Sequence, residues 1–134
     1  MREYLAEYRA HYGLDARVII QDEALTQFRS EAGVQVHRII QEALTNVRKH
    51  AKSTQAHVRF EREGNSVRIT VEDNGRGFNP AELNEEDGRQ CYGIQIMRER
   101  AEGIGGTLEF ISRVNEGTRV VLRVPTAVMQ IGGA

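Results

Sequence analysis

The strongest pattern in the sequence is a helical one between Ala32 and Val47. Apolar residues recur there at intervals of three and four positions, which gathers them on one face of a helix: Val36, Ile39, Ile40, Ala43, Leu44 and Val47. A helix with one apolar face must bury that face against another layer of the same domain. The chain has 134 residues, enough for one such domain but too few for two with adequate cores.

The partner layer is predicted to be a β-sheet. Residues 56–61 and 66–72 alternate apolar and polar side chains, and the Gly-Asn pair between them is typical of a hairpin turn. Residues 107–112 and 118–124 form a second predicted hairpin, and Arg17-Val-Ile-Ile is a short β-branched strand. We therefore predict an α+β sandwich, with helices packed on one face of a mixed, mainly antiparallel sheet.

A second core helix is predicted to end at Gly105-Gly106, and its apolar face consists of Ile94, Met97, Ala101 and Ile104. The polar stretch before it, residues 79–92, has neither a helical nor a strand period. We predict that this stretch is a loop, long enough to act as a lid.

The two ends of the chain are predicted to lie outside the domain. Residues 1–12 have a weak helical period without a capping residue at the start, so we expect residues 1–14 to be the end of an upstream helix or linker in a longer protein. The domain itself is predicted at residues 15–126, followed by a flexible tail at residues 127–134.

Charge and composition exclude several classes of function. Eighteen lysines and arginines against nineteen acidic residues give a net charge of −1, which provides no bulk attraction to nucleic acid. The only cysteine, Cys91, cannot form an internal disulfide, and no apolar run approaches the roughly 20 residues that cross a bilayer. We expect a cytoplasmic domain, and the sequence leaves open whether a parent protein is anchored in the inner membrane.

Two polar residues stand out on the first core helix. Glu42 and Asn46 are four positions apart, so their side chains lie one turn apart beside the apolar face. A rigid element thus holds a carboxylate next to an amide. Taken alone, such a pair most often belongs to a solvated helix face.

A second candidate site follows the strand that ends near residue 72. The segment Asp73-Asn-Gly75-Arg-Gly77-Phe contains an Asn-Gly pair that is typical of hairpin turns, but no alternating strand follows it. The two glycines allow close approach of the backbone to a ligand, and the Asp73 carboxylate suits an exocyclic amine. Glycines after strands are also common turn formers, and both interpretations remain open.

A third candidate is Gly93, which we expect just before the second core helix. Backbone N–H groups at a helix start bind phosphate oxygens, although an ordinary helix start has the same sequence. The chain contains no P-loop, and its glycines do not fit a dinucleotide-binding fingerprint. His11, His37, His50 and His57 are too scattered for a zinc site.

Four segments in order along the chain resemble the N, G1, G2 and closing-strand motifs of the GHKL ATPase superfamily. They are Gln41-Glu-Ala-Leu-Thr-Asn46-Val-Arg-Lys-His50, Asp73-Asn-Gly-Arg-Gly77-Phe, Tyr92-Gly-Ile-Gln-Ile-Met-Arg-Glu-Arg and Gly117-Thr-Arg-Val-Val-Leu. Within that superfamily they are similar to the catalytic domain of bacterial sensor histidine kinases of the nitrate/nitrite-sensor class. The resemblance covers about residues 17–125 and implies the Bergerat fold, in agreement with the predicted sandwich.

The resemblance also implies a site for ATP and Mg²⁺. In this site Asn46 is a ligand of Mg²⁺, Asp73 accepts a hydrogen bond from the adenine amino group, and Glu42 polarises the nucleophile. The other nucleotide contacts that the resemblance implies are Gly75, Gly77, Tyr92, Gly93, Ile94 and Thr118, with residues 79–92 as the lid. Further candidates for phosphate or partner contacts are Arg76, Arg98 and Arg100.

The implied function is that of a protein histidine kinase catalytic domain. It transfers the γ-phosphoryl group of ATP to a histidine on an upstream dimerisation domain, which then serves a response regulator. Neither His11 nor His37 resembles that acceptor, so the chain alone is expected to bind ATP without phosphorylating itself. Without the upstream helices it is also expected to be a monomer. Cys91 stands where many relatives carry histidine, which leaves the lid contact of that position open.

Three alternatives remain open at this point. A GHKL serine kinase of the anti-sigma type shares the fold and most of the motifs. An ATP-driven clamp would need a further domain after the last strand. A nucleotide-binding module without catalysis would need no Glu42.

Overall fold

The computed structural model of the chain describes residues 1–47, 55–75 and 88–129, and of residues 88–92 only the backbone. The elements along the chain are α1 (Arg2–Tyr12), β1 (Asp15–Ile20), the 3₁₀ turn η1 (Glu23–Thr26), α2 (Ser30–Asn46), β2 (Gln55–Glu63), β3 (Ser66–Asp73), α3 (Gly88–Gly103), β4 (Thr107–Arg113), β5 (Gly117–Pro125) and the 3₁₀ turn η5 (Thr126–Val128). Among the helices of the described segments, none is both long and apolar enough to cross a lipid bilayer.

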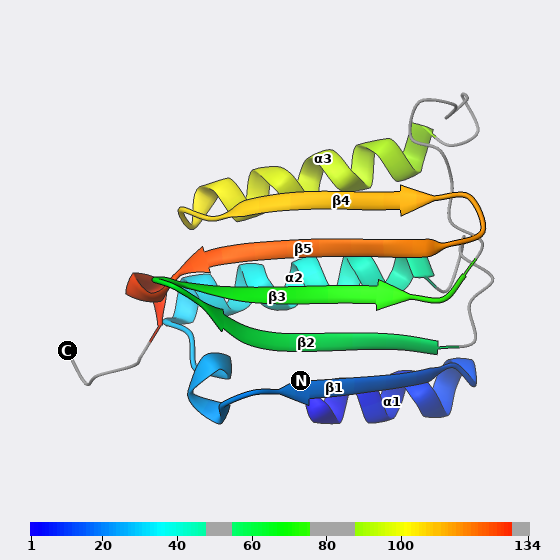
Figure 1. Ribbon diagram of the computed structural model, residues 1–134, viewed down its shortest axis with the longest axis horizontal. Coiled ribbons are helices and arrows are strands. Elements are labelled where there is room, and N and C mark those ends of the chain that lie inside the picture. Colours follow the sequence, from blue (N-terminus) through cyan, green and yellow to red (C-terminus); the bar gives the residue numbers. More distant parts are fainter. Residues whose placement is uncertain (48–54, 76–87, 130–134) are drawn as a thin grey trace.

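The strands form one five-stranded sheet in the order β1-β2-β3-β5-β4. β1 pairs with β2 in parallel, and the other three pairings are antiparallel. All three helices lie on the same face of this sheet, with α2 behind its centre, α1 behind β1 and α3 behind β4 (Figure 1). The prediction of an α+β sandwich with a mixed, mainly antiparallel sheet is therefore confirmed.

The core lies between α2 and the sheet, as the helical period predicts. Every residue of the predicted stripe, from Val36 to Val47, is buried, and Leu44 has no exposed surface. The sheet contributes its alternate residues to the same cluster, including Val58, Ile69 and Leu122. Because the apolar face of α2 must point toward the sheet, the rotation of the helix about its axis is fixed. This also fixes the direction of the polar side chains beside that face.

The second core helix differs from its prediction at both ends. α3 begins at Gly88, five residues before Gly93, so the described end of the predicted lid loop, residues 88–92, is helical. It ends at Gly103, where the N–H of Gly106 donates to the Ala101 carbonyl at 2.8 Å and Gly105 adopts a φ of 77°. Ile104 thus follows the helix instead of closing it. The first turn of α3 has no apolar period, which is why sequence reasoning assigned it to the loop.

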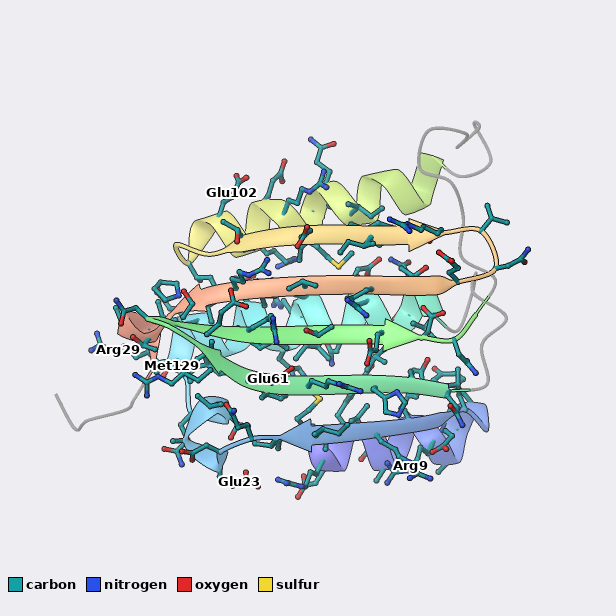
Figure 2. The ribbon with its side chains drawn as sticks, viewed as in Figure 1. Arg9, Glu23, Arg29, Glu61, Glu102 and Met129 are labelled. Atoms are coloured by element: carbon teal, nitrogen blue, oxygen red, sulfur yellow. The ribbon has the colours of Figure 1, made fainter. Side chains whose placement is uncertain are left out.

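Both ends of the described chain pack on the domain. In α1, Leu5 and Tyr8 are buried, and the Tyr8 hydroxyl donates to the Leu44 carbonyl at 2.8 Å. Met129 is buried as well and pairs with Phe28, beside Arg29 (Figure 2). We propose on this basis that the packed unit includes α1 and reaches Met129, beyond the predicted boundaries at residues 15 and 126. Residues 130–134 of the predicted tail lie outside the described residues.

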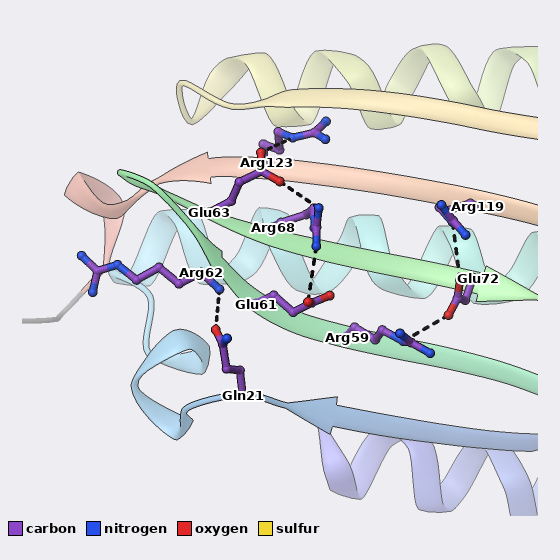
Figure 3. Close-up of polar contacts among 9 residues, drawn as sticks. All are labelled: Gln21, Arg59, Glu61, Arg62, Glu63, Arg68, Glu72, Arg119 and Arg123. Atoms are coloured by element: carbon purple, nitrogen blue, oxygen red, sulfur yellow. Dashed lines mark hydrogen bonds and ion pairs between the residues drawn. The ribbon is translucent and has the colours of Figure 1, made fainter.

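The face of the sheet without helices carries a network of ion pairs (Figure 3). Its ion pairs include those of Glu63 with Arg68 and Arg123, and those of Glu72 with Arg59 and Arg119, at 2.8 to 3.4 Å. The hydrogen bond from Arg123 lowers the pKa of Glu63 below its ordinary range. In the middle of this face Thr70 and Val121 pair across the sheet and are buried. The arginines of this face thus have carboxylate partners, as expected for a solvated surface.

Candidate functional site

The predicted site residues converge at one end of the sandwich. Figure 1 shows the end of α2, the end of β3, the start of β5 and the start of α3 at the same end of the molecule. Asp73 and Thr118 are direct partners in the register of β3 and β5. Asn46 is the last residue of α2. The fold therefore brings together residues from segments more than 25 positions apart.

Asp73 is held by two backbone donors. The Gly75 N–H donates to the Asp73 carboxylate at 2.7 Å, and the Thr118 N–H donates to it as well. Burial of the side chain nevertheless raises the pKa of Asp73 above its ordinary value, because desolvation outweighs the two hydrogen bonds. The hydroxyl of Thr118 lies 2.9 Å from the hydroxyl of Ser112. Asp73 is thus a fixed, half-buried acceptor at the end of the sheet.

Gly117 is required for this arrangement. Its φ is 82°, and a Cβ at this position would lie about 2.2 Å from the Asp73 carbonyl oxygen. No side chain fits there unless the backbone of β3 or β5 moves. The sequence indicated only a turn at Gly117, because the close approach of β3 is a tertiary contact.

The amide nitrogen of Asn46 is buried, although the residue as a whole is only partly buried. Its Nδ2 atom has no hydrogen-bond partner among the described residues. A buried amide group without a partner costs about 1–3 kcal/mol, and rotation of the amide by 180° would present Oδ1 at the same place. This side chain therefore fits a role as a ligand of a hard cation or of a polar group that is bound from outside the chain.

Glu42 lies one turn before Asn46 and is partly exposed. The backbone of Gly93 in α3 lies against it, since a Cβ at Gly93 would be 2.9 Å from Glu42 Oε1. The prediction that Gly93 lies just before the second core helix was wrong, because Gly93 is the sixth residue of α3. The N–H groups at the start of α3 belong to residues before Gly93, so a phosphate site at the helix start would not include it.

The remaining candidates divide into three groups. Ile94 is buried in the core cluster, with 8 % of its surface exposed. Gly77 and Arg76 lie outside the described residues, and of Tyr92 and Cys91 only the helical backbone is described. Arg98 is exposed, whereas Arg100 donates to Gln35 Oε1 at 3.0 Å. The lysine and histidine that end the first motif also lie outside the described residues.

Glu42 lines a cleft of about 530 Å³ between the helices. Among its lining residues are Tyr4 of α1, Arg38 and Glu42 of α2, and Gly93 and Arg100 of α3. Sequence reasoning did not single out Tyr4 or Arg38. The helical period could have found Arg38, which is four positions before Glu42, but Tyr4 enters the cleft through the packing of α1.

Substitution of Gly117 by alanine should destabilise the domain more than the same change at Gly64. Both glycines have positive φ angles in hairpin turns, but a Cβ at Gly64 would meet nothing within 4 Å. Gly64→Ala therefore tests backbone strain alone, whereas Gly117→Ala adds a clash that costs about 1–3 kcal/mol more. Urea unfolding of both variants measures the difference, and equal losses would contradict the close packing of Gly117 on Asp73.

The raised pKa of Asp73 predicts a specific dependence of stability on pH. At neutral pH the ionised carboxylate costs the folded state free energy, and this cost disappears as the pH falls through the folded pKa toward the unfolded value of about 3.9. The unfolding free energy of the wild type should therefore rise relative to that of Asp73→Asn as the pH falls from 7 to 4. Urea titrations of both proteins across this range measure it, and a fall would show that the pKa of Asp73 is lowered.

Comparison with known proteins places the chain in a family. Residues 31–128 match the model of the "Histidine kinase-, DNA gyrase B-, and HSP90-like ATPase" family. The sensor histidine kinase LiaS of Bacillus subtilis is 36% identical over 127 residues, which are 93% of this chain and 33% of LiaS. The histidine-protein kinase/phosphatase DegS of Brevibacillus brevis is 30% identical over 93% of this chain and 31% of DegS. The chain thus spans about a third of the length of these curated relatives.

A solved structure agrees with the fold. The ATP binding domain of PrrB from Mycobacterium tuberculosis superposes with a TM-score of 0.72 at 22% identity, over 92% of this chain and 88% of that domain. The family match includes α2, the end of β3, α3 and β5, the elements that carry Glu42, Asn46, Asp73 and Thr118. This chain therefore belongs to the histidine kinase-, DNA gyrase B- and HSP90-like ATPases, a family of ATP-binding domains.

Proposed function

We propose that this chain is the ATP-binding catalytic domain of a two-component sensor histidine kinase. The observation that carries the proposal is the placement of a fixed acceptor (Asp73), an unsatisfied amide (Asn46) and a partly exposed carboxylate (Glu42) around one end of the sandwich. The names of the relatives, a sensor histidine kinase and a signal transduction histidine-protein kinase/phosphatase, support this proposal over a serine kinase or a clamp. The nitrate/nitrite-sensor class remains a prediction from the sequence.

Asp73 would bind the purine. Its carboxylate retains acceptor capacity beyond the two backbone donors, and a hydrogen bond from the adenine amino group would stabilise the ionised form that burial disfavours. Gly75 and Thr118 flank this carboxylate and would border the purine, and we extend the same role to Gly77 from the sequence motif. Tyr92, Gly93 and Ile94 remain proposed contacts on the side of the lid.

Asn46 would hold Mg²⁺ through its amide oxygen. This ion takes few protein ligands and keeps waters and phosphate oxygens, so one amide suits it. When bound, Mg²⁺ neutralises charge on the β- and γ-phosphate oxygens.

Glu42 would act as the base for the nucleophile. A nitrogen of the acceptor imidazole attacks the γ-phosphorus, a P–N bond forms, the P–O bond to the β-phosphate breaks, and ADP leaves. The proton lost from the imidazole passes to the Glu42 carboxylate. The absence of a side chain at Gly93 leaves room for this carboxylate against the backbone of α3.

The partners follow from this reaction. We propose that the acceptor histidine lies on a dimerisation domain of the parent kinase and that a response regulator receives the phosphoryl group from it. A cytoplasmic location and a monomeric state of the isolated chain remain predictions from the sequence.

Asn46→Ala should weaken ATP binding mainly when Mg²⁺ is present. Loss of a ligand to a charged group corresponds to about a tenfold or larger change in affinity. Titration calorimetry with ATP, in magnesium and in EDTA, measures this, with Gln27→Ala as a control because Gln27 is exposed and follows η1 at the opposite end of the sandwich (Figure 1). An equal loss in both buffers would contradict the metal role.

The kinase proposal can be tested in a chimera in which this chain replaces the matching third of LiaS. We expect ATP to label the chimera with phosphate that is labile in acid and stable in base, as a phosphoramidate is. Glu42→Gln should lower the labelling rate by roughly 10²- to 10⁴-fold with ATP affinity retained, since a general base is lost. Glu102→Gln, an exposed position of α3 (Figure 2), serves as the matched control.

Two results would each contradict one part of this proposal, the kinase function or the role of Glu42. A wild-type chimera that binds ATP but acquires no such phosphate would refute the kinase proposal. Full activity of the Glu42→Gln chimera would instead leave the kinase standing and show that Glu42 has a structural role.

A further inference from the structure

Three side chains are spaced one turn apart along α2. Asn46, Glu42 and Arg38 lie at intervals of four residues, and a rise of 1.5 Å per residue separates successive members by about 6 Å along the axis. Asn46 is at the end of α2 that lies at the same end of the molecule as the end of β3 and the start of β5 (Figure 1). Arg38 is therefore about 12 Å from Asn46 along the helix axis, on the far side of Glu42 from the proposed metal.

Phosphoryl transfer requires the nucleophile and the leaving group on opposite sides of the phosphorus. With the purine at Asp73 and the metal at Asn46, ADP departs toward the end of the sheet. The acceptor must then approach Glu42 from the other direction, where the cleft between α1, α2 and α3 opens. The geometry of the reaction thus assigns the nucleotide and the acceptor to opposite sides of Glu42.

The volume of the cleft leaves room for more than the acceptor imidazole. Its volume of about 530 Å³ exceeds what a single imidazole needs, and it is within the range of ligand pockets. A second hollow of about 590 Å³ shares Ile96 and Arg100 with it, but Glu31 and Glu99 also line this second hollow, so the excess of positive charge is confined to the first one. The buried side chain of Met97 also lines the first hollow, so both apolar and charged groups can be accommodated.

The charge of the cleft defines the chemistry of its occupant. Arg38 is exposed and makes no ion pair within the part of the chain that the structure describes, and Arg100 donates to the neutral oxygen of Gln35. These two guanidinium groups share the cleft with one carboxylate, that of Glu42. On the open face of the sheet, by contrast, Arg68 and Arg123 are matched by carboxylates.

We infer that this cleft is the docking site of the acceptor segment, and that Arg38 and Arg100 bind an acidic side chain close to the acceptor histidine. The inference rests on the proposed kinase function and adds to it the side from which the acceptor arrives and the charge that it carries. An acidic group held by two arginines would place the imidazole against Glu42, on the far side of the phosphorus from ADP. The arginines then contribute to acceptor binding and not to nucleotide binding.

The LiaS chimera described above tests the inference when charge is reversed at Arg38. Arg38→Glu should lower the rate of phosphate incorporation about tenfold or more, and Arg38→Lys should retain most of it because the charge is kept. The affinity of the unfused chain for ATP and its thermal midpoint should be unchanged in both variants. Arg17→Glu is the matched control, because Arg17 is an exposed arginine on β1.

Arg100→Gln provides a second test that does not reverse a charge. It should reduce incorporation in the same direction as Arg38→Glu, and the effect of both variants should diminish in high salt, which screens charge attraction.

Each outcome has a defined meaning. Incorporation at the wild-type rate in both arginine variants would overturn the docking site while leaving the kinase intact. A parallel loss of ATP affinity would also overturn it, because the arginines would then bind the phosphates of the nucleotide. A wild-type chimera that binds ATP without acquiring phosphate would refute the kinase proposal itself, and the docking site with it.

Discussion

The burial of one face of α2 against the sheet determines the geometry of the whole site. Each large apolar side chain buried in this way stabilises the fold by about 1.5–3 kcal/mol, whereas an exposed ion pair contributes about 0–1 kcal/mol. The rotation of α2 about its axis is therefore set by its apolar stripe and not by its polar contacts. Glu42 and Asn46 flank that stripe, so the core holds them at fixed positions without any direct bond between them.

A second constraint acts where β3 meets β5. The backbone of Gly117 lies so close to the Asp73 carbonyl that a larger residue would displace one of the two strands. The same pairing brings the Thr118 N–H to the Asp73 carboxylate, yet burial still raises the pKa of that group. A half-buried carboxylate that the fold holds at a cost in stability is typical of a functional site, and a donor on a ligand would offset the cost.

The sequence predicted those parts of the structure that repeat with a period. The stripe of α2 and the two hairpins follow from spacings of 3.6 and 2 residues, and their residues lie where the spacing puts them. The start of α3 lacks such a period. The sequence pattern therefore puts the start of this helix near Gly93, whereas the helix begins five residues earlier, at Gly88. The contacts of Gly117 with Asp73 and of Tyr8 with Leu44 join distant segments, so no local pattern could reveal them. The proposed roles of Asp73, Asn46 and Glu42 come from a family resemblance. To these the structure adds the cleft and the Asn46 amide nitrogen, which has no partner among the described residues.

The proposed roles are ordered along one rigid helix, with the metal ligand, the base and the acceptor-side cation at successive turns of α2. The proposed purine end of the site belongs to the sheet through Asp73, whereas the proposed acceptor end borders α1 through Tyr4. α1 also bonds to the last turn of α2 through the Tyr8 hydroxyl. Because the two ends are attached to different layers of the sandwich, a change in the position of α1 would alter the cleft and the last turn of α2 while Asp73 kept its backbone donors. In this arrangement the elements that bind the purine differ from those that meet the acceptor, and α2 sets the distance between them.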